Sequence, residues 1–365
     1  MKILVICTTP FSTNGITNVI SNYDYYINRG EICMDYVLIN KKHNSKTKKL
    51  KGNVFFLPMR NRNPFVYFFK LYKLMKKGKY SLVHVHGNSS TMLVEILAAF
   101  AAGVPNRIAH AHSTYCTHEK VNKILAPVFR KLVTYGIACS RDAGQWLFGN
   151  KTPFFISKNG IDIDRFSFNI ETRKKYRKEL GWEDSFVIGN VGYLGYPKNQ
   201  SFLIDIFNEI QKKNINAKLI LVGEGEDFSE LQKKVNELNL KTKVEFLGQR
   251  NDVNMLLQAM DFFVVPSFFE GFSISILEAE ISGLKIICSD TIPREVNVTG
   301  NVIYQSLNTG PQSWAQVITM QKDYQRNDQS ELMYKQGLSV EQTALEIKKL
   351  YMVLIKRNGV RKCIR

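Results

Sequence analysis

The chain has 365 residues, of which 44% are hydrophobic, and this length and composition suit two globular domains better than one. Its six cysteines include no CxxC pair, which argues against a disulfide framework or a cysteine zinc site and indicates a reducing compartment. No apolar stretch is long enough for a signal peptide or a membrane span, so we expect a cytoplasmic protein that is not integral to a membrane, and the net charge of +18 indicates an anionic partner.

Apolar runs and helical patterns alternate along the chain in two series. The first series predicts strands at residues 2–7, 34–38, 54–57, 81–86, 106–110 and 135–139, and helices at 16–29, 64–78, 89–103, 118–133 and 141–148. The second predicts strands at 186–191, 218–222, 244–247, 262–265 and 285–288, and helices at 200–213, 228–239, 251–259, 274–282 and 311–322. The charged stretch 164–183 is the expected linker. Because continuous apolar strands are typical of covered parallel sheets, we predict an α/β protein of two doubly wound domains facing across a cleft.

The segment 41–79 carries thirteen Lys or Arg residues and no Asp or Glu. Its second half mixes aromatic residues with Lys70, Lys73, Lys76 and Lys77 in a helical pattern, which is typical of a helix that docks on an anionic membrane surface. Two other interpretations remain: nucleic-acid binding, for which no recognised motif is present, and a solvated basic face whose aromatic residues pack into the core.

Four histidines lie at the ends of two predicted strands. His84 and His86 form one i, i+2 pair, and His110 and His112 form another, so each pair points to one face of its strand. A metal site is conceivable, but without nearby Cys or paired carboxylates the zinc signal is weak, and we expect no metal. For His84, His86 and His110 we favour structural roles or support of a neighbouring site residue.

The segment 261–288 reads as strand, loop, helix and strand, and it carries Glu270 on the loop and Glu278 in the helix. In such a unit the helix N-terminus points at a ligand above the sheet edge, and this end of a helix can bind a phosphate. The two carboxylates can bind hydroxyl groups strongly. Phosphate and hydroxyl groups together describe a nucleotide-sugar. Alternatively, Ser275 and Glu278 have the spacing of a capping box, and Glu270 is a solvated loop residue.

A dehydrogenase would also use doubly wound domains, but its fingerprint is absent. The segment TTPFSTNGITN after the first strand has no G-x-G-x-x-G, and Gly223 and Gly225 are not followed by a third glycine. The order and spacing of several segments instead resemble retaining family 4 glycosyltransferases of bacterial capsule and exopolysaccharide assembly. These segments are FSTNGITNVI near the N-terminus, VHVH (83–86), RIAHAHST (107–114), GIACSRDAGQWLFG (136–149), SKNGIDIDRF (157–166), GNVGYLGYPKNQSFLIDIF (189–207), LILVGEGE (219–226), VEFLGQRNDV (244–253) and E-x7-E followed by EAEISGLKIICSDTIPREV.

The resemblance implies the GT-B fold, with two Rossmann-like domains. Residues 1–165 would form the acceptor-side domain and residues 166–339 the nucleotide-sugar domain, and a final helix at about 340–356 would return to the first domain.

The resemblance also assigns roles to single residues. Glu270 would hold the donor sugar hydroxyls, Glu278 the ribose hydroxyls, and His112 would contact the donor sugar near the reacting carbon. The backbone of Gly271, Phe272 and Ser273 would bind the diphosphate.

Three further positions belong to the expected donor site. Lys198 matches a lysine that contacts the diphosphate, although an exposed lysine at a helix start is the plain alternative. Tyr193 occupies the position of the arginine that usually completes this cationic clamp. Gly15 matches a glycine loop under the phosphates, with Asn14 in place of a first glycine, and an ordinary β-to-α turn is the alternative.

The sequence thus predicts a retaining glycosyltransferase that uses no cofactor or metal and takes a nucleoside-diphosphate sugar as donor. Its acceptor would be a hydroxyl of a lipid-linked saccharide at the inner face of the cytoplasmic membrane, where the protein would be peripheral. No nucleic-acid partner is expected. The alternatives are a nucleotide-sugar epimerase or hydrolase of the same architecture, and a catalytically silent sugar-nucleotide-binding subunit that activates a partner transferase.

Overall fold

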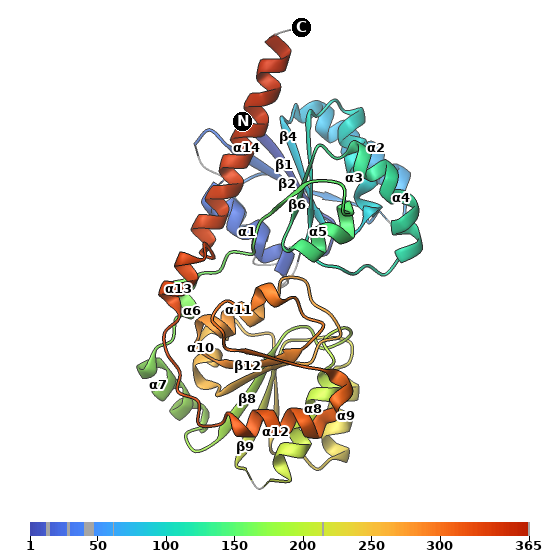
Figure 1. The fold of residues 1–365 in the computed structure, drawn as a ribbon. Helices are drawn as coiled ribbons and strands as arrows, with labels where there is room; N and C mark the ends of the chain where they lie inside the picture. Colours follow the sequence, from blue (N-terminus) through green and yellow to red (C-terminus); the bar gives the residue numbers. More distant parts are fainter. Residues whose placement is uncertain (12–14, 28–29, 40–46, 61, 214, 364–365) are drawn as a thin grey trace. The chain divides into compact units, whose positions relative to one another are not determined.

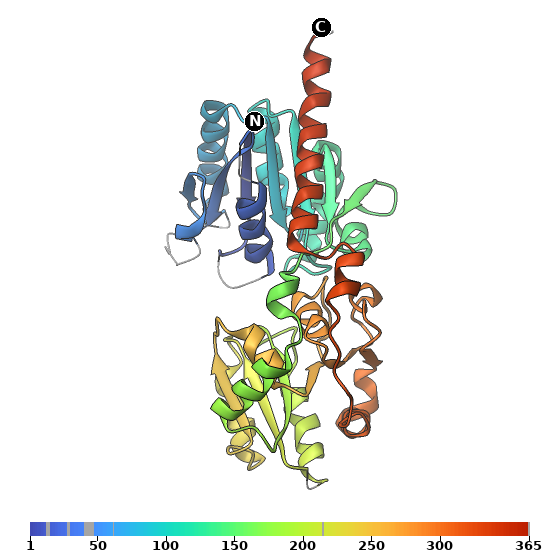
Figure 2. The same cartoon turned by 90° about the vertical axis from the view of Figure 1, so that its left-hand side faces the viewer.

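The computed structural model describes the chain except for residues 12–14, 28–29, 40–46, 61, 214 and 364–365. It divides into two compact units, one made of Met1–Gly160 with Val340–Arg365 and the other of Ile161–Ser339 (Figures 1 and 2). The sequence pattern places the boundary between residues 165 and 166 instead. Among the described residues, no helix has both the length and the apolar character needed to cross a membrane.

The first unit contains a seven-stranded parallel sheet in the order β3-β2-β1-β4-β5-β6-β7. The strand order reverses between β1 and β4, as in a doubly wound fold. The short strand β7 escaped prediction because its three residues give no readable pattern. The strands are β1 (Lys2–Cys7), β2 (Cys33–Ile39), β3 (Val54–Leu57), β4 (Leu82–Gly87), β5 (Asn106–Ala111), β6 (Tyr135–Ala138) and β7 (Phe154–Ile156).

Helices cover both faces of this sheet (Figure 1). On one face, Ile20 of α1 and Ile347 and Tyr351 of α14 enter the same buried cluster as Val5 of β1. Figure 1 shows α2, α3 and α4 on the other side. The helices of this unit are α1 (Gly15–Ile27), α2 (Pro64–Gly78), α3 (Leu93–Ala101), α4 (Glu119–Leu132), α5 (Arg141–Phe148) and α14 (Val340–Cys363).

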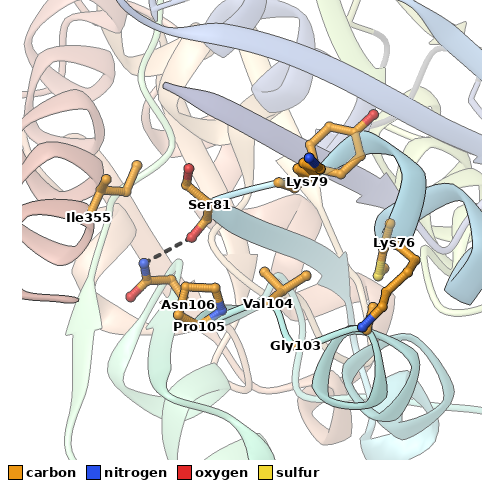
Figure 3. A pocket seen from close by; sticks show the side chains of 11 residues that line it. Lys76, Lys79, Ser81, Gly103, Val104, Pro105, Asn106 and Ile355 are labelled. Carbon is orange, nitrogen blue, oxygen red and sulfur yellow. Dashed lines mark hydrogen bonds between the residues drawn. The ribbon is translucent and has the colours of Figure 1, made fainter. Parts of the chain in front are cut away.

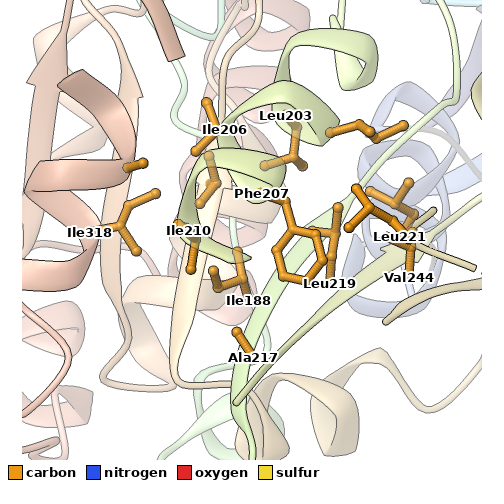
Figure 4. Close-up of a cluster of buried hydrophobic side chains, with 14 of the residues drawn as sticks. Ile188, Leu203, Ile206, Phe207, Ile210, Ala217, Leu219, Leu221, Val244 and Ile318 are labelled. Carbon is orange, nitrogen blue, oxygen red and sulfur yellow. The ribbon is translucent and has the colours of Figure 1, made fainter. Parts of the chain in front are cut away.

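The second unit contains a six-stranded parallel sheet in the order β10-β9-β8-β11-β12-β13, which reverses between β8 and β11. On one face, Phe207 of α8 packs against Leu219 and Leu221 of β9 and Ile188 of β8 (Figure 4). The strands are β8 (Phe186–Val191), β9 (Ala217–Val222), β10 (Val244–Gly248), β11 (Phe262–Val265), β12 (Lys285–Ser289) and β13 (Val302–Gln305). The helices are α6 (Ile163–Phe166), α7 (Ile170–Leu180), α8 (Gln200–Gln211), α9 (Phe228–Glu237), α10 (Val253–Ala259), α11 (Ile274–Ile281), α12 (Gly310–Met320) and α13 (Ser330–Lys335). The prediction of two doubly wound domains is confirmed.

The prediction of a linker at 164–183 is wrong, because this charged stretch forms α6 and α7 within the second unit. Arg173 and Arg177 lie one helical turn apart on α7, and both bind the carboxylate of Asp261 just before β11. Asp261 also accepts a hydrogen bond from the backbone N–H of Val187 in β8, at 2.7 Å. These two arginines therefore fasten α7 to the beginnings of two central strands.

Candidate functional site

The carboxyl ends of β8 and β11 carry most of the predicted site residues. A tight turn of residues 192–199 follows β8, and a loop of residues 266–273 leads from β11 into α11. These strands are neighbours at the point where the strand order reverses. Ligands of open α/β sheets bind in the crevice that such a reversal creates. The second unit thus places the two segments side by side where a ligand is expected.

Lys198 of the turn and Glu270 of the loop form an ion pair. The Lys198 Nζ lies 2.5 Å from the Glu270 Oε1, and the two side chains are only 20% and 10% exposed. Ser267 Oγ donates a second hydrogen bond to the same carboxylate oxygen, at 2.9 Å. A Cβ at Gly192 would lie 3.4 Å from the Lys198 Cε, so the lysine stem runs over the glycine backbone. The structure therefore brings together two residues that stand far apart in sequence, and Ser267 is a partner that the sequence did not reveal.

Two buried amide side chains hold the turn after β8 in place. The Gln200 Nε2 donates to the Tyr193 carbonyl at 2.8 Å, and its Oε1 accepts from the Gly195 N–H at 3.3 Å. The Asn190 Nδ2 donates to the Val264 carbonyl of β11 at 2.7 Å. Because buried polar groups are normally hydrogen-bonded to something they organise, these amides position the turn that carries Lys198. Sequence reasoning missed both, although an amide inside the apolar run of β8 was a visible signal.

The loop after β9 supports the same turn through two glycines. A Cβ at Gly223 would lie 1.9 Å from the carbonyl oxygen of Gly192, and one at Gly225 would lie 1.9 Å from that of Leu194. Gly223 also has a φ of +138°, which side chains rarely adopt. The glycines of the segment 219–226 therefore allow two loops to approach closely. This packing role explains the glycines without a dinucleotide-binding function.

Tyr193, at the usual arginine position, is 50% exposed. The two arginines that could replace the missing cation already have partners in this structure. Arg250 binds the Asp252 carboxylate at 2.6 Å, and the Arg294 guanidinium lies 3.7 Å from the centre of the Tyr304 ring. Of these three cations, Lys198 is the one that lies against Glu270.

Helix α11 begins without a side-chain cap. Its N-cap residue is Ser273, which makes no capping hydrogen bond, and Ser275 lies inside the helix. The capping-box interpretation of Ser275 and Glu278 is therefore wrong, because that box needs its serine at the N-cap. The first backbone N–H groups of a helix have no acceptor within it, so this end can bind an anion. Gly271 and Phe272 lie on the loop immediately before it, and the Phe272 side chain is buried.

Glu278 stands in α11 with its carboxyl group in a strongly desolvating environment. Desolvation raises its pKa to about 8, against the opposing charge of Arg165. Arg165 is fixed by a 2.9 Å hydrogen bond to the Asn251 carbonyl. Within the part of the chain that the structure describes, the Glu278 carboxyl accepts no hydrogen bond, so it can bind hydroxyl groups of a ligand. Arg165 was missed because its distance from Glu278 in sequence gives no sign of this electrostatic interaction.

The first unit carries the other two predicted residues. Gly15 begins α1, which follows β1, whereas Asn14 lies outside the described residues. His112 follows β5, and its Nε2 lies 2.9 Å from the Nδ1 of His86 in β4. Burial lowers the pKa of His112 to about 3 and lowers that of His86 well below its usual value. Both imidazoles are therefore neutral at physiological pH.

A separate hollow of about 510 Å³ lies in the first unit at the amino-terminal ends of β4 and β5 (Figure 3). The Asn106 Nδ2 donates to the Ser81 carbonyl there, at 2.9 Å, and Lys76, Lys79 and Ile355 line other parts of the wall. Doubly wound sheets bind ligands at the carboxyl ends of their strands. We therefore do not assign this hollow to the donor.

Several known proteins are similar to the chain in both sequence and architecture. The family Glycosyltransferase Family 4 matches residues 39–165, and Glycosyl transferases group 1 matches residues 172–310. The chain is 29% identical to EpsF of Bacillus subtilis (strain 168) over 83% of each chain. It is 31% identical to the UDP-Gal:alpha-D-GlcNAc-diphosphoundecaprenol alpha-1,3-galactosyltransferase of Escherichia coli, over 73% of this chain and 72% of that protein. HepE of Anabaena, in a crystal structure with UDP and glucose, has a TM-score of 0.75 at 19% identity, with both chains covered completely, which shows the GT-B fold. The chain therefore belongs to the group 1 glycosyltransferases and is a glycosyltransferase of the GT-B fold.

Proposed function

We propose that this chain is a retaining glycosyltransferase that moves a sugar from a nucleoside-diphosphate sugar to a hydroxyl of a lipid-linked saccharide in surface polysaccharide synthesis. The Lys198–Glu270 pair beside the uncapped start of α11 is the observation that carries this proposal. The similar Escherichia coli protein is named for a UDP-galactose donor and a diphosphoundecaprenol-linked acceptor, and HepE was crystallised with UDP and glucose, which supports the same substrate classes here.

The second unit binds the donor through carboxylates that accept hydrogen bonds from hydroxyl groups and through cationic or N–H groups that bind the diphosphate. Glu278 accepts hydrogen bonds from the ribose hydroxyls, and Glu270 accepts them from hydroxyls of the donor sugar. Lys198 and the backbone N–H groups from Gly271 to the start of α11 hold the diphosphate. Because Lys198 and Glu270 are paired in the structure, ligand binding places the diphosphate against the cation and the sugar hydroxyls against the carboxylate, so neither charge becomes isolated. In the first unit, we propose that His112 and the backbone at Gly15 contact substrate.

Transfer occurs on one face of the sugar. The acceptor oxygen forms a bond to the anomeric carbon as the bond from that carbon to the diphosphate oxygen breaks. The departing diphosphate takes the proton of the acceptor hydroxyl, so the sugar keeps its configuration. Lys198 and the helix N-terminus stabilise the charge that develops on the leaving group, which is the contribution that usually lowers such barriers most. We propose that these fixed charges and dipoles make a catalytic metal unnecessary.

The release of nucleotide should depend on the acceptor. The purified chain is incubated with a panel of nucleotide-sugars, with and without lipid-linked saccharides, and free nucleotide is measured. We expect one donor to give release only when an acceptor is present. Release without acceptor would favour the hydrolase or epimerase alternative. Binding without release under any condition would favour the silent subunit, which Tyr193 at the usual arginine position makes a specific alternative.

We also propose that the first unit docks on the inner face of the cytoplasmic membrane through α2, α3 and α4. On α2, Phe65 and Phe69 are 76% and 57% exposed among exposed lysines, so these two aromatic side chains do not pack into the core. On α3 and α4, Phe100 and Ile124 are 53% and 73% exposed. Aromatic and aliphatic side chains among basic residues suit the boundary between headgroups and acyl chains. The contribution of α3 and α4 could not be recognised from the charge of α2 alone.

Replacing Lys70, Lys73, Lys76 and Lys77 by Gln should weaken binding to anionic liposomes by up to about 10²–10³-fold, because each basic residue near such a surface contributes about 1 kcal/mol. Cosedimentation at several salt concentrations measures the effect, and the residual binding should depend less on salt. A control with Lys174, Lys175, Lys178 and Lys233 changed to Gln removes the same charge from exposed positions of the second unit. Equal loss in both variants would contradict a docking surface on α2.

A further inference from the structure

Three histidines of the first unit form a cluster in its core that the proposed reaction does not use. His84 and His86 of β4 and His110 of β5 are completely buried. His86 and His110 face each other across the two strands. The His84 ring stacks on those of His86 and His110, the His86 and His110 rings are tilted by 35°, and the centroids lie 4.1 to 5.3 Å apart. One ring nitrogen from each of the three lies within 4.8 Å of the other two. The cluster sits on the sheet face that α1 and α14 cover.

Several nitrogens of this cluster have no hydrogen-bond partner among the described residues. They are the Nε2 of His84, the Nε2 of His86, and both ring nitrogens of His110. Leaving a buried polar atom without a partner is energetically costly, so four such atoms in one place need a common explanation. A ligand that accepts electron pairs from several imidazoles supplies one.

The remaining ring nitrogens hold two of the rings in a defined orientation. The Nδ1 of His84 lies 2.6 Å from the Tyr351 hydroxyl of α14, and the Nδ1 of His86 lies 2.9 Å from the Nε2 of His112. When each Nδ1 carries the proton, the Nε2 of both rings keeps a lone pair that no described residue uses. Metal-binding histidines are usually fixed in this way, by a hydrogen bond from the nitrogen that does not bind the metal.

We propose that His84, His86 and His110 bind a Zn²⁺ ion in the core of the first unit. Three neutral imidazoles with one further ligand make a tetrahedral zinc site, and water or hydroxide fills the fourth position. Zn–N bonds of about 2.0–2.1 Å place the three nitrogens roughly 3.4 Å apart, so the side chains must close in by roughly 1 Å. The ion ties β4 to β5 beneath α1 and α14. The ion is no part of the donor site in the second unit, and it fixes the ring of His86, whose Nδ1 contacts His112.

Metal analysis of the whole chain tests this proposal. Protein is stripped with a chelator, dialysed against Zn²⁺ alone or Co²⁺ alone, freed of excess ion and assayed by elemental analysis. We expect about one metal ion per chain, a visible absorption band typical of four-coordinate Co²⁺, and a higher melting temperature that the chelator reverses. The variant His110→Gln should lose all three signals. The control His118→Gln changes an exposed histidine of the same unit and should keep them.

A structural measurement on the unchanged chain keeps the test decisive if His110→Gln fails to fold. X-ray absorption at the zinc edge should show three imidazole nitrogens at about 2.0–2.1 Å and no sulfur. A parent chain that retains no metal and gives no Co²⁺ band would overturn the proposal, as would sulfur neighbours or undiminished metal in a folded His110→Gln variant. The three rings would then be a stacked element of the core.

Discussion

Lys198→Ala should lower the turnover number by about 10²–10³-fold, the scale seen when one preorganised donor to a developing negative charge is removed. The loss should fall toward the upper end, because Tyr193 provides no neighbouring cation and Arg250 and Arg294 are bound to Asp252 and stacked on Tyr304. Steady-state rates at saturating donor and acceptor measure the effect. Donor affinity should change less than turnover, because the charge of the leaving group is greatest in the transition state.

The same substitution leaves Glu270 in a site where it is only 10% exposed and without its cation, so folding must be measured alongside activity. Adding Tyr193→Arg to Lys198→Ala returns a cation to the turn and should restore part of the rate, and Tyr193→Arg alone should be neutral or beneficial. Turnover that is unchanged in a folded Lys198→Ala variant would remove Lys198 from the mechanism. Arg294 and Arg250 would then be the next candidates.

Glu278→Ala should weaken nucleotide binding by about 10–10²-fold, because hydrogen bonds to a charged group contribute about 1.5–3 kcal/mol. Helix α11 should keep its stability, since Glu278 takes no part in a cap. Isothermal calorimetry with the free nucleotide gives the affinity, and thermal unfolding gives the stability. Unchanged affinity in a folded variant would exclude Glu278 from the ribose site.

Nucleotide affinity should also rise with pH up to about pH 8 and level off above it. The pKa of Glu278 is about 8 in the free protein, so at lower pH the carboxyl group is mostly protonated and must lose its proton to accept two hydroxyl groups. Binding should therefore release protons below pH 8, which calorimetry in buffers of different ionisation enthalpy detects. In Glu278→Gln this pH dependence should disappear. A parent affinity that is flat or falls over this range would contradict the assignment.

The two doubly wound units could be predicted because a parallel sheet covered on both faces needs continuous apolar strands separated by amphipathic helices, and both signals are local in sequence. The charged segment that forms α7 could not be predicted from local sequence to be a packed helix of the second unit. Its charge suggested a linker, whereas Arg173 and Arg177 pair with Asp261 in the fold. Charge alone does not distinguish a solvated helix from one with a partner far away in sequence.

In the site, too, local features could be predicted from the sequence and contacts between distant residues could not. Glu270 and Glu278 could be singled out because their spacing and the helix between strands are local features. The ion pair of Glu270 with Lys198 and the electrostatic interaction of Glu278 with Arg165 depend on which elements become neighbours, and no local pattern contains that information. The histidines illustrate the limit as well: the i, i+2 spacing predicted a common face within each pair, but only the pairing of β4 with β5 brings the two pairs together.

The anomeric configuration of the product tests the central claim most directly. The purified chain is given the nucleotide-sugar that supports acceptor-dependent release, together with its lipid-linked acceptor, and the new glycosidic bond is assigned from the coupling between the first two protons of the transferred sugar. A retaining transferase gives a product in which the sugar keeps the configuration that it had in the donor. A product of inverted configuration, or free sugar in place of a glycoside, would contradict the central claim.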